Sequence, residues 1–119
     1  MNSTPQPGPL SEEALSQAMD GLWARFLPDI RARVSVLEAG AQAASEGKLT
    51  AKQRETSQTA AHKLAGVLGT FGLTRGTVLA RELELAFARE SSPGRDAGAK
   101  LAGIAAELRS MIESREPSA

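Results

Sequence analysis

The sequence predicts an all-α fold: an antiparallel up-down-up-down four-helix bundle with a short additional N-terminal helix. Aromatic residues make up only 3% of the 119 residues, and few segments are rich enough in β-branched side chains to suggest strands. Ala and Leu recur instead at the three- and four-residue spacings of amphipathic helices. Short loops connect the four longest of these segments, and short loops make neighbouring helices pack antiparallel.

One domain is expected to fill most of the chain, because 119 residues support a single hydrophobic core. Residues 1–9 (MNSTPQPGP) hold three prolines and a glycine among small polar side chains, which predicts a disordered N-terminal lead. The bundle is expected over residues 10–115. Residues 116–119 are expected to form a disordered tail.

Two helices are expected in the first part of the domain. Ser11, followed by two glutamates, is the predicted N-cap of the short first helix. Pro28 cannot donate a backbone hydrogen bond but suits the first position of a helix, so a second helix is expected to start there and to end at Gly47. The predicted buried positions of the two helices are Leu15, Met19, Leu22, Trp23 and Phe26, then Ile30, Val34, Leu37, Ala41 and Ala44.

Three further helices are expected after this pair. Thr50 is the predicted N-cap of the next helix, which ends at Gly72, and Thr74 is the predicted N-cap of the helix after it. Ser92 with Pro93 is expected to open the last helix. The apolar positions that mark the buried faces are Ala60, Ala61, Leu64, Val67, Leu68, Phe71, Leu79, Leu83, Ala86, Phe87, Leu101, Ile104, Ala105, Leu108, Met111 and Ile112.

Composition excludes several classes of function. Fourteen Lys and Arg residues balance fourteen Asp and Glu residues, so no sustained basic surface is expected and nucleic acid is not an expected partner. Without cysteine the chain can form neither a disulfide nor a thiolate zinc site. No apolar run reaches the ~20 residues that span a bilayer, and the N-terminus lacks the features of a secretory signal. We therefore expect a cytoplasmic protein without a membrane partner.

The chain has one histidine, His62, and it is expected on the outer face of its helix. On a helical wheel at about 100° per residue, the apolar residues of this helix fall within roughly 60° of Leu64, whereas His62 lies roughly 160° away. Gly66 and Gly69 are its nearest neighbours on that face, and each costs about 1 kcal/mol relative to alanine in a helix interior. Two explanations stay open for these glycines: close approach of another protein, or close packing against a neighbouring helix.

Other chemistry finds little support around His62. A lone histidine on a helix is commonly an ordinary solvated residue, and without cysteine it makes a poor metal site. Ser57 and Thr59 lie near it in the sequence but without the glycine-flanked turn of a hydrolase nucleophile. The chain has neither a Gly-rich phosphate loop followed by Lys-Ser/Thr nor a protein-kinase signature, so ATP chemistry is not supported.

The segment Ala61–Leu73 (AHKLAGVLGTFGL) closely resembles the phosphoacceptor helix of histidine-containing phosphotransfer (HPt) domains, whose usual pattern is A-H-x-L-K-G-x-x-x-x-x-G. This chain matches the pattern at Ala61, His62, Leu64, Gly66 and Gly72. The likeness continues in the next helix at residues 79–84 (LARELE), and the helix pattern from about residue 11 to residue 112 is similar to the family's architecture. The resemblance implies that His62 is a phosphoacceptor.

Ala65 departs from the family pattern, because most HPt domains have a lysine three residues after the histidine that helps to hold phosphate oxygens. The sequence is similar here to the variant H-K-L-A-G of HPt domains attached to receiver-type regulators. Ala65 lies roughly 60° round the wheel from His62 and is expected at the helix surface. Lys63 lies about 100° round the helix from His62, so its side chain could reach back toward the histidine only in part. The alternative is that Lys63 is a solvated charge. With Gly66 and Gly69 these residues form the expected docking and phosphate environment.

A partner for the imidazole is expected on the next helix. If the chain reverses near Leu73, the residue level with His62 is near position 84, which is Glu84. The resemblance implies that Glu84 bonds one ring nitrogen, so that the other is free to attack. Arg81, one turn earlier, is expected nearby, where its charge could compensate for the missing lysine. The alternative for both side chains is that they are ordinary exposed charges.

The resemblance implies a phosphoryl carrier of a two-component phosphorelay, not an enzyme. His62 would accept the group from a receiver aspartate and pass it to another receiver, so the expected partners are response-regulator receiver domains, with a hybrid histidine kinase among them. No metal or cofactor is expected in this chain, because Mg²⁺ belongs to the receiver's own pocket. A monomer is expected. The alternative is a degenerate HPt-like helical adaptor that binds a receiver or self-associates without phosphotransfer, which the absence of the lysine favours.

Overall fold

The computed structural model describes residues 11–89 and 93–115, which form four α-helices and, within these ranges, no β-strand. The helices are α1 (Glu12–Ser45), α2 (Ala51–Thr70), α3 (Thr74–Ala88) and α4 (Arg95–Glu113). The all-α prediction is therefore confirmed. The predicted lead over residues 1–9, the predicted tail over residues 116–119 and the predicted helix start at Ser92 lie outside the described residues.

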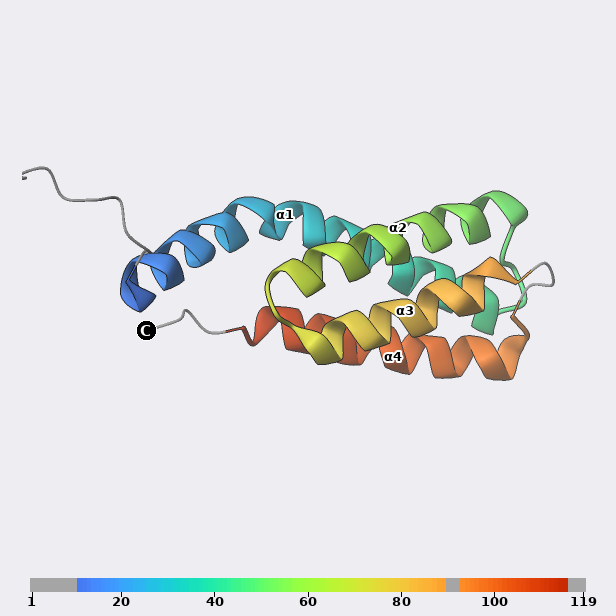
Figure 1. Cartoon of the computed structure of the whole chain (residues 1–119). Coiled ribbons are helices and arrows are strands. Elements are labelled where there is room, and N and C mark those ends of the chain that lie inside the picture. The colour runs from blue at the N-terminus through green and yellow to red at the C-terminus, as the bar shows by residue number, and fades with distance from the viewer. Residues whose placement is uncertain (1–10, 90–92, 116–119) are drawn as a thin grey trace, which may run out of the picture.

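The four helices lie side by side, and the chain reverses its direction at each connection between them (Figure 1). α2 packs against α1 and α3, and α4 packs against α3 and α1, so the helices enclose one core. The largest fully buried side chains come from all four helices: Ile30, Leu37, Leu64, Leu68, Leu79, Leu83, Phe87 and Leu108. This arrangement places α2 between two neighbours and leaves one side of it facing outward.

Four helix ends form as the sequence predicts. The hydroxyl oxygens of Ser11 and Thr50 each accept a hydrogen bond from the backbone N–H three residues later, at 3.1 and 3.0 Å. These bonds satisfy donors that have no partner within the helix. α1 and α2 each run into a glycine with positive φ, Gly47 at 71° and Gly72 at 73°, a conformation that side chains disfavour.

The predicted N-cap of α3 is wrong, because Leu73 and not Thr74 occupies that position and makes no side-chain bond. The backbone N–H of Leu73 donates to the Leu68 carbonyl at 3.0 Å, and its own carbonyl accepts from the Thr77 N–H at 2.9 Å. One residue thus completes the end of α2 and begins α3. The turn is too short to include a separate capping side chain.

The predicted place of Pro93 inside the last helix is also wrong. Pro93 precedes the helix, Gly94 is its N-cap, and the helix begins at Arg95. Gly94 has an extended backbone (φ −73°, ψ 178°), so the helix begins only after it. A Cβ atom added at Gly98 would collide with the backbone of Ser45, so the first turn of α4 lies directly on the last turn of α1.

The predicted break at Pro28 is wrong as well, because α1 continues through this residue as one helix. A proline inside a helix removes the N–H that would bond the carbonyl four residues earlier, here that of Ala24. Both residues are exposed, so water can solvate that carbonyl. Trp23 and Ile30, on either side of the proline, are buried in the same core cluster and hold the two segments in one line. The described residues therefore contain no separate short N-terminal helix.

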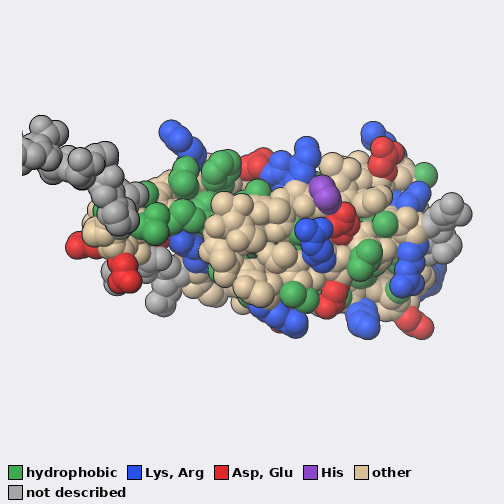
Figure 2. Space-filling model, viewed as in Figure 1, with side chains coloured by type: hydrophobic (Ala, Val, Ile, Leu, Met, Phe, Trp, Pro, Cys, Tyr) green, Lys and Arg blue, Asp and Glu red, His purple; other side chains and the backbone are tan. Residues whose placement is uncertain are grey.

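The N-terminal part of α1 extends beyond the α2–α3 turn (Figure 1), and its predicted apolar stripe is only partly buried. Leu15, Leu22 and Phe26 are 50%, 40% and 41% exposed, and Figure 2 shows hydrophobic side chains gathered on this end of the molecule. The prediction of burial is wrong for these three residues because few neighbours cover this part of α1, where Phe26 lines only a shallow groove beside α2. Trp23 stays buried, and its ring meets that of Phe71 edge-on with centroids 5.1 Å apart.

Arg115, just after α4, ties this end of the molecule together. Its guanidinium lies 4.9 Å from the centroid of the Trp23 ring and 5.8 Å from that of Phe71, within the range of cation–π attraction. The same group forms an ion pair with Asp20 at 3.2 Å. Side chains from α1, the end of α2 and the end of α4 therefore meet at one point.

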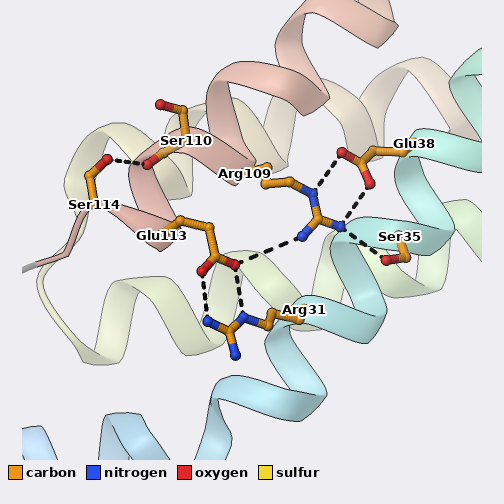
Figure 3. Close-up of polar contacts among 7 residues, drawn as sticks. All are labelled: Arg31, Ser35, Glu38, Arg109, Ser110, Glu113 and Ser114. Atoms are coloured by element: carbon orange, nitrogen blue, oxygen red, sulfur yellow. Dashed lines mark hydrogen bonds and ion pairs between the residues drawn. The ribbon is translucent and has the colours of Figure 1, made fainter.

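A network of ion pairs joins α1 to α4 (Figure 3). Arg31 donates to both carboxylate oxygens of Glu113, at 2.7 and 2.8 Å. Arg109 donates to both oxygens of Glu38 at the same two distances and to Ser35 Oγ at 3.0 Å. The hydrogen bond from Arg31 lowers the pKa of Glu113 below its ordinary value, and the bond to Glu38 raises the pKa of Arg109.

Replacing Glu113 with glutamine should lower thermal stability at neutral pH and matter less in acid. Because the folded-state pKa of Glu113 lies below its unfolded value, its carboxylate stabilises the fold above that unfolded value. This contribution disappears as the pH falls through the folded pKa. Thermal unfolding of the parent and Glu113→Gln, followed by circular dichroism from neutral pH into acid, measures the effect. A difference in melting temperature that stays constant over the whole range would contradict it.

Candidate functional site

His62 stands in the middle part of α2, with 65% of its side chain exposed. α2 turns another arc of its surface, about 140° wide, toward α1 and α3. The buried residues on that arc are Ser57, Ala60, Ala61, Leu64, Ala65 and Leu68. The predicted outward position of His62 is confirmed, and Figure 2 shows the histidine at the surface beside acidic and basic side chains.

Glu84 of α3 lies where the hairpin geometry predicts, against the imidazole of His62. Its Oε2 atom is 2.7 Å from Nδ1, and its side chain is only 20% exposed. An ionised carboxylate can only accept a hydrogen bond, so Nδ1 carries the ring proton and donates it to Glu84. In the neutral ring Nε2 then presents its lone pair to solvent. The imidazole is therefore oriented, with one nitrogen held by the carboxylate and the other free.

Small side chains let α3 approach α2 closely enough for this contact. Ala61 and Ala65 of α2 are buried, as are Gly76 and Ala80 of α3. A Cβ atom added at Gly76 would lie 3.1 Å from Cδ1 of Leu68, tighter than nine in ten real Cβ contacts. Only three residues separate the two helices, so their register at the site is set by the turn.

Two cations lie on different sides of His62. Arg81 of α3 is 56% exposed, and its Nη1 atom lies 3.3 Å from Oε1 of Glu84, the carboxylate oxygen that His62 does not use. Lys63 is exposed and lies about 100° further round α2, where it lines grooves between α1 and α2. The structure thus connects Arg81 to the histidine through a shared carboxylate and places Lys63 on the α1 side.

A shallow groove runs from His62 toward α1. The residues that line it are Phe26, Asp29 and Arg33 of α1 and His62, Lys63, Gly66, Val67 and Thr70 of α2. The part of this groove that α1 forms cannot be predicted from the sequence when Pro28 is interpreted as the start of a helix. With Pro28 inside one helix, the three- and four-residue spacing of Phe26, Asp29 and Arg33 puts them on one face, and this spacing is the signal that identifies them.

Internal packing does not require the glycines beside His62. Gly66 and Gly69 are both exposed. A Cβ atom at Gly66 would meet nothing within 4 Å, and one at Gly69 would make an ordinary contact of 3.5 Å with Thr77 Oγ1. Of the two explanations that the sequence left open, close packing against a neighbouring helix therefore loses its basis.

Ala65 does not lie on the exposed surface that the sequence predicts. It is 1% exposed, and its carbonyl oxygen accepts a hydrogen bond from the Thr77 hydroxyl at 3.4 Å. The prediction of exposure is wrong because α2 packs against two helices, so its buried arc is wider than the single stripe centred on Leu64. The methyl group of Ala65 belongs to the contact between α2 and α3.

Within the described ranges, no group of three or more His, Cys, Asp or Glu side chains is placed to hold a metal ion. None of the helices in this part of the chain is long and apolar enough to cross a membrane. The chemistry that the site does offer is that of one oriented imidazole nitrogen facing solvent.

Comparison with known proteins points to one family. The family model described as Hpt domain matches residues 21–116. Protein RcaC of Microchaete diplosiphon is 34% identical over 74 residues, a match that covers 62% of this chain and 11% of RcaC. The chain thus spans a small part of that relative's length. No solved structure matches the chain.

Replacing Ala65 with lysine should destabilise the protein by about 1 to 3 kcal/mol, because a long side chain must enter or displace the contact between α2 and α3. Gly66→Lys is the control, since it adds the same charge one residue later, where a Cβ atom meets nothing within 4 Å. It should leave the free energy of unfolding unchanged or raise it. Urea denaturation compares the two variants, and equal stabilities would show that position 65 opens freely to solvent.

Proposed function

Because the chain belongs to the Hpt domain family, we propose that it is a histidine phosphotransfer protein of a two-component phosphorelay, with His62 as its phosphoacceptor. The observation that carries this proposal is the pair formed by His62 and Glu84. Nδ1 is held at 2.7 Å by the carboxylate while 65% of the histidine side chain remains exposed. A nucleophile that must meet a group on another protein needs both features.

The proposed reaction uses the free lone pair of Nε2. This nitrogen attacks the phosphorus of an aspartyl phosphate on a receiver domain, the P–O bond to the aspartate breaks, and the aspartate carboxylate leaves. The Nδ1 proton stays on the ring, where the Glu84 carboxylate offsets the positive charge that the ring gains. Attack by the aspartate of a second receiver reverses these steps. Mg²⁺ and lysine in the receiver's pocket stabilise the transferring group, so the chain acts as a carrier without kinase activity or a cofactor of its own.

The partners in this proposal are response-regulator receiver domains, including that of a hybrid histidine kinase. Transfer requires Nε2 to approach the phosphorus to about 3 to 3.5 Å, so the two proteins must meet closely around the histidine. Gly66, one turn after His62, puts no side chain in the way, and the groove toward Phe26 offers apolar surface beside it. The protein is proposed to act as a cytoplasmic monomer that docks a receiver on the outward side of α2.

His62→Gln should abolish phosphoryl acceptance and leave the fold intact. The side chain is largely exposed, so its replacement changes little packing. The parent and the variant are incubated with a phosphorylated receiver domain, acid-labile and base-stable label is counted on each, and helicity is compared by circular dichroism. Substantial labelling of His62→Gln would place the phosphoacceptor elsewhere.

The same experiment separates the carrier from the adaptor. Receiver binding is measured by calorimetry on the proteins used for labelling. A parent protein that binds the receiver but gains no label would support the degenerate HPt-like adaptor instead of the carrier.

Gly66→Leu should weaken receiver binding and slow phosphotransfer, because the new side chain stands where a receiver must approach. Its stability should hold or rise, since leucine has open space there and helix propensity improves by up to about 1 kcal/mol. Gly103→Leu is the matched control: this exposed glycine lies in α4, and a Cβ atom there also meets nothing within 4 Å. Equal receiver affinities for the two variants would contradict docking beside Gly66.

A further inference from the structure

A phosphoryl group on Nε2 of His62 would bring negative charge to a site that already holds a carboxylate. Glu84 Oε2 lies 2.7 Å from Nδ1 of the same ring, and a phosphoryl group adds roughly two further negative charges. Two negative groups on opposite sides of one imidazole ring repel each other, so any cation that can reach the phosphoryl oxygens stabilises the phosphorylated state. Three cations border this part of the described surface: Arg33, Lys63 and Arg81.

The three cations differ in what already holds them. Arg33 forms an ion pair with Asp29 on its own helix, across the groove from His62. Lys63 lies about 100° round α2 from the histidine, toward α1. Arg81 alone among these three shares an acidic partner with the imidazole, because the two oxygens of Glu84 are divided between Arg81 and His62. The Glu84 carboxylate therefore links its guanidinium to the ring.

Glu84 holds Arg81 less tightly than it holds His62. The Nη1–Oε1 distance is 3.3 Å, beyond the usual range of an N–H···O hydrogen bond, and 56% of the Arg81 side chain is exposed to screening by water. The contact between Glu84 and Nδ1 is 2.7 Å. A planar guanidinium can bind two phosphoryl oxygens at once. Arg81 would therefore make two hydrogen bonds in a phosphorylated site, whereas it now contacts a single carboxylate oxygen.

We propose that Arg81 changes partner when His62 is phosphorylated, pairing with Glu84 in the free protein and with the phosphoryl oxygens afterwards. The inference rests on the proposed function and identifies the residue that holds the transferred group. The exchange breaks one ion pair and forms another without moving a proton. When Arg81 leaves Glu84, the carboxylate interacts with the Nδ1–H group of His62 alone. The phosphoryl-binding cation then comes from α3, whereas Ala65 on α2 brings no charge.

Phosphoramidate tests this inference without a receiver. Nε2 attacks its phosphorus, the P–N bond of phosphoramidate breaks, and ammonia leaves, so His62 can be phosphorylated in the parent and in each variant. The half-life of the phosphohistidine is then followed by phosphorus NMR after the reagent is removed. Arg81→Gln should shorten the half-life about two- to fivefold, the range expected for one exposed charge pair, and Arg81→Lys should recover part of it.

Arg75→Gln is the matched control for Arg81→Gln. Arg75 lies on the same helix, is 58% exposed, and is also 3.3 Å from its glutamate partner, but that partner is Glu107 of α4. Its replacement should leave the half-life unchanged. Equal shortening by both glutamine variants would assign the effect to the general charge of α3 and overturn the role of Arg81.

Two further outcomes separate this inference from the proposal beneath it. If His62 gains label in the parent and in Arg81→Gln, and both phosphohistidines decay at the same rate, the role of Arg81 is overturned and the phosphotransfer proposal stands. If phosphoramidate leaves His62 of the parent unlabelled, the proposed function fails and this inference fails with it. Thermal unfolding of each variant shows whether a change in half-life accompanies an intact fold.

Discussion

The close packing of α3 against α2 is the constraint on which the site depends. A histidine on an exposed helix face and a glutamate on the next helix are both ordinary residues until the two helices bring them together. Buried Gly76 and Ala80 on α3 permit the approach that puts Glu84 at 2.7 Å from Nδ1 of His62. A separation larger by about 1 Å would lengthen this contact to about 3.7 Å, which is beyond hydrogen-bonding distance. The orientation of the imidazole is thus a property of the interface between α2 and α3.

The opposite side of the bundle carries the contacts that hold the frame. Gly98 lets the first turn of α4 lie on the end of α1, and the pairs made by Arg31 and Arg109 join the same two helices further along. α2 contributes to the core through one arc only, so its outward face is free to carry residues that do not favour a helix. Gly66 and Gly69 cost about 1 kcal/mol each in helix propensity, and the rest of the bundle must offset that cost. The two glycines thus leave open space beside His62 and lower the local stability of α2.

Features that depend on neighbours in the sequence could be predicted, and features that depend on distant packing could not. His62 and Glu84 could be placed together because helical periodicity and a short turn determine their relative positions. The continuation of α1 through Pro28 could not be predicted from the local rule for proline. It depends on buried residues on both sides of the proline, which hold α1 in one line. The exposure of Ala65 and the burial of Phe26 were misjudged for a related reason. The number of helices packed against a segment decides how wide its buried arc is, and one helical wheel does not contain that number.

A phosphoryl carrier must release its group as readily as it accepts it, and the position of His62 on the surface suits that requirement. A phosphoryl group enclosed among buried cations would be held strongly and released slowly, whereas pairs screened by water are each worth less than about 1 kcal/mol, or roughly a factor of five. The exposed imidazole and the exposed guanidinium of Arg81 both lie in this screened regime. The chain itself can then favour the acceptance or the release of the phosphoryl group only slightly. In the proposed relay, the difference between the two receiver pockets determines the direction of net phosphoryl flow, and the carrier remains close to neutral between them.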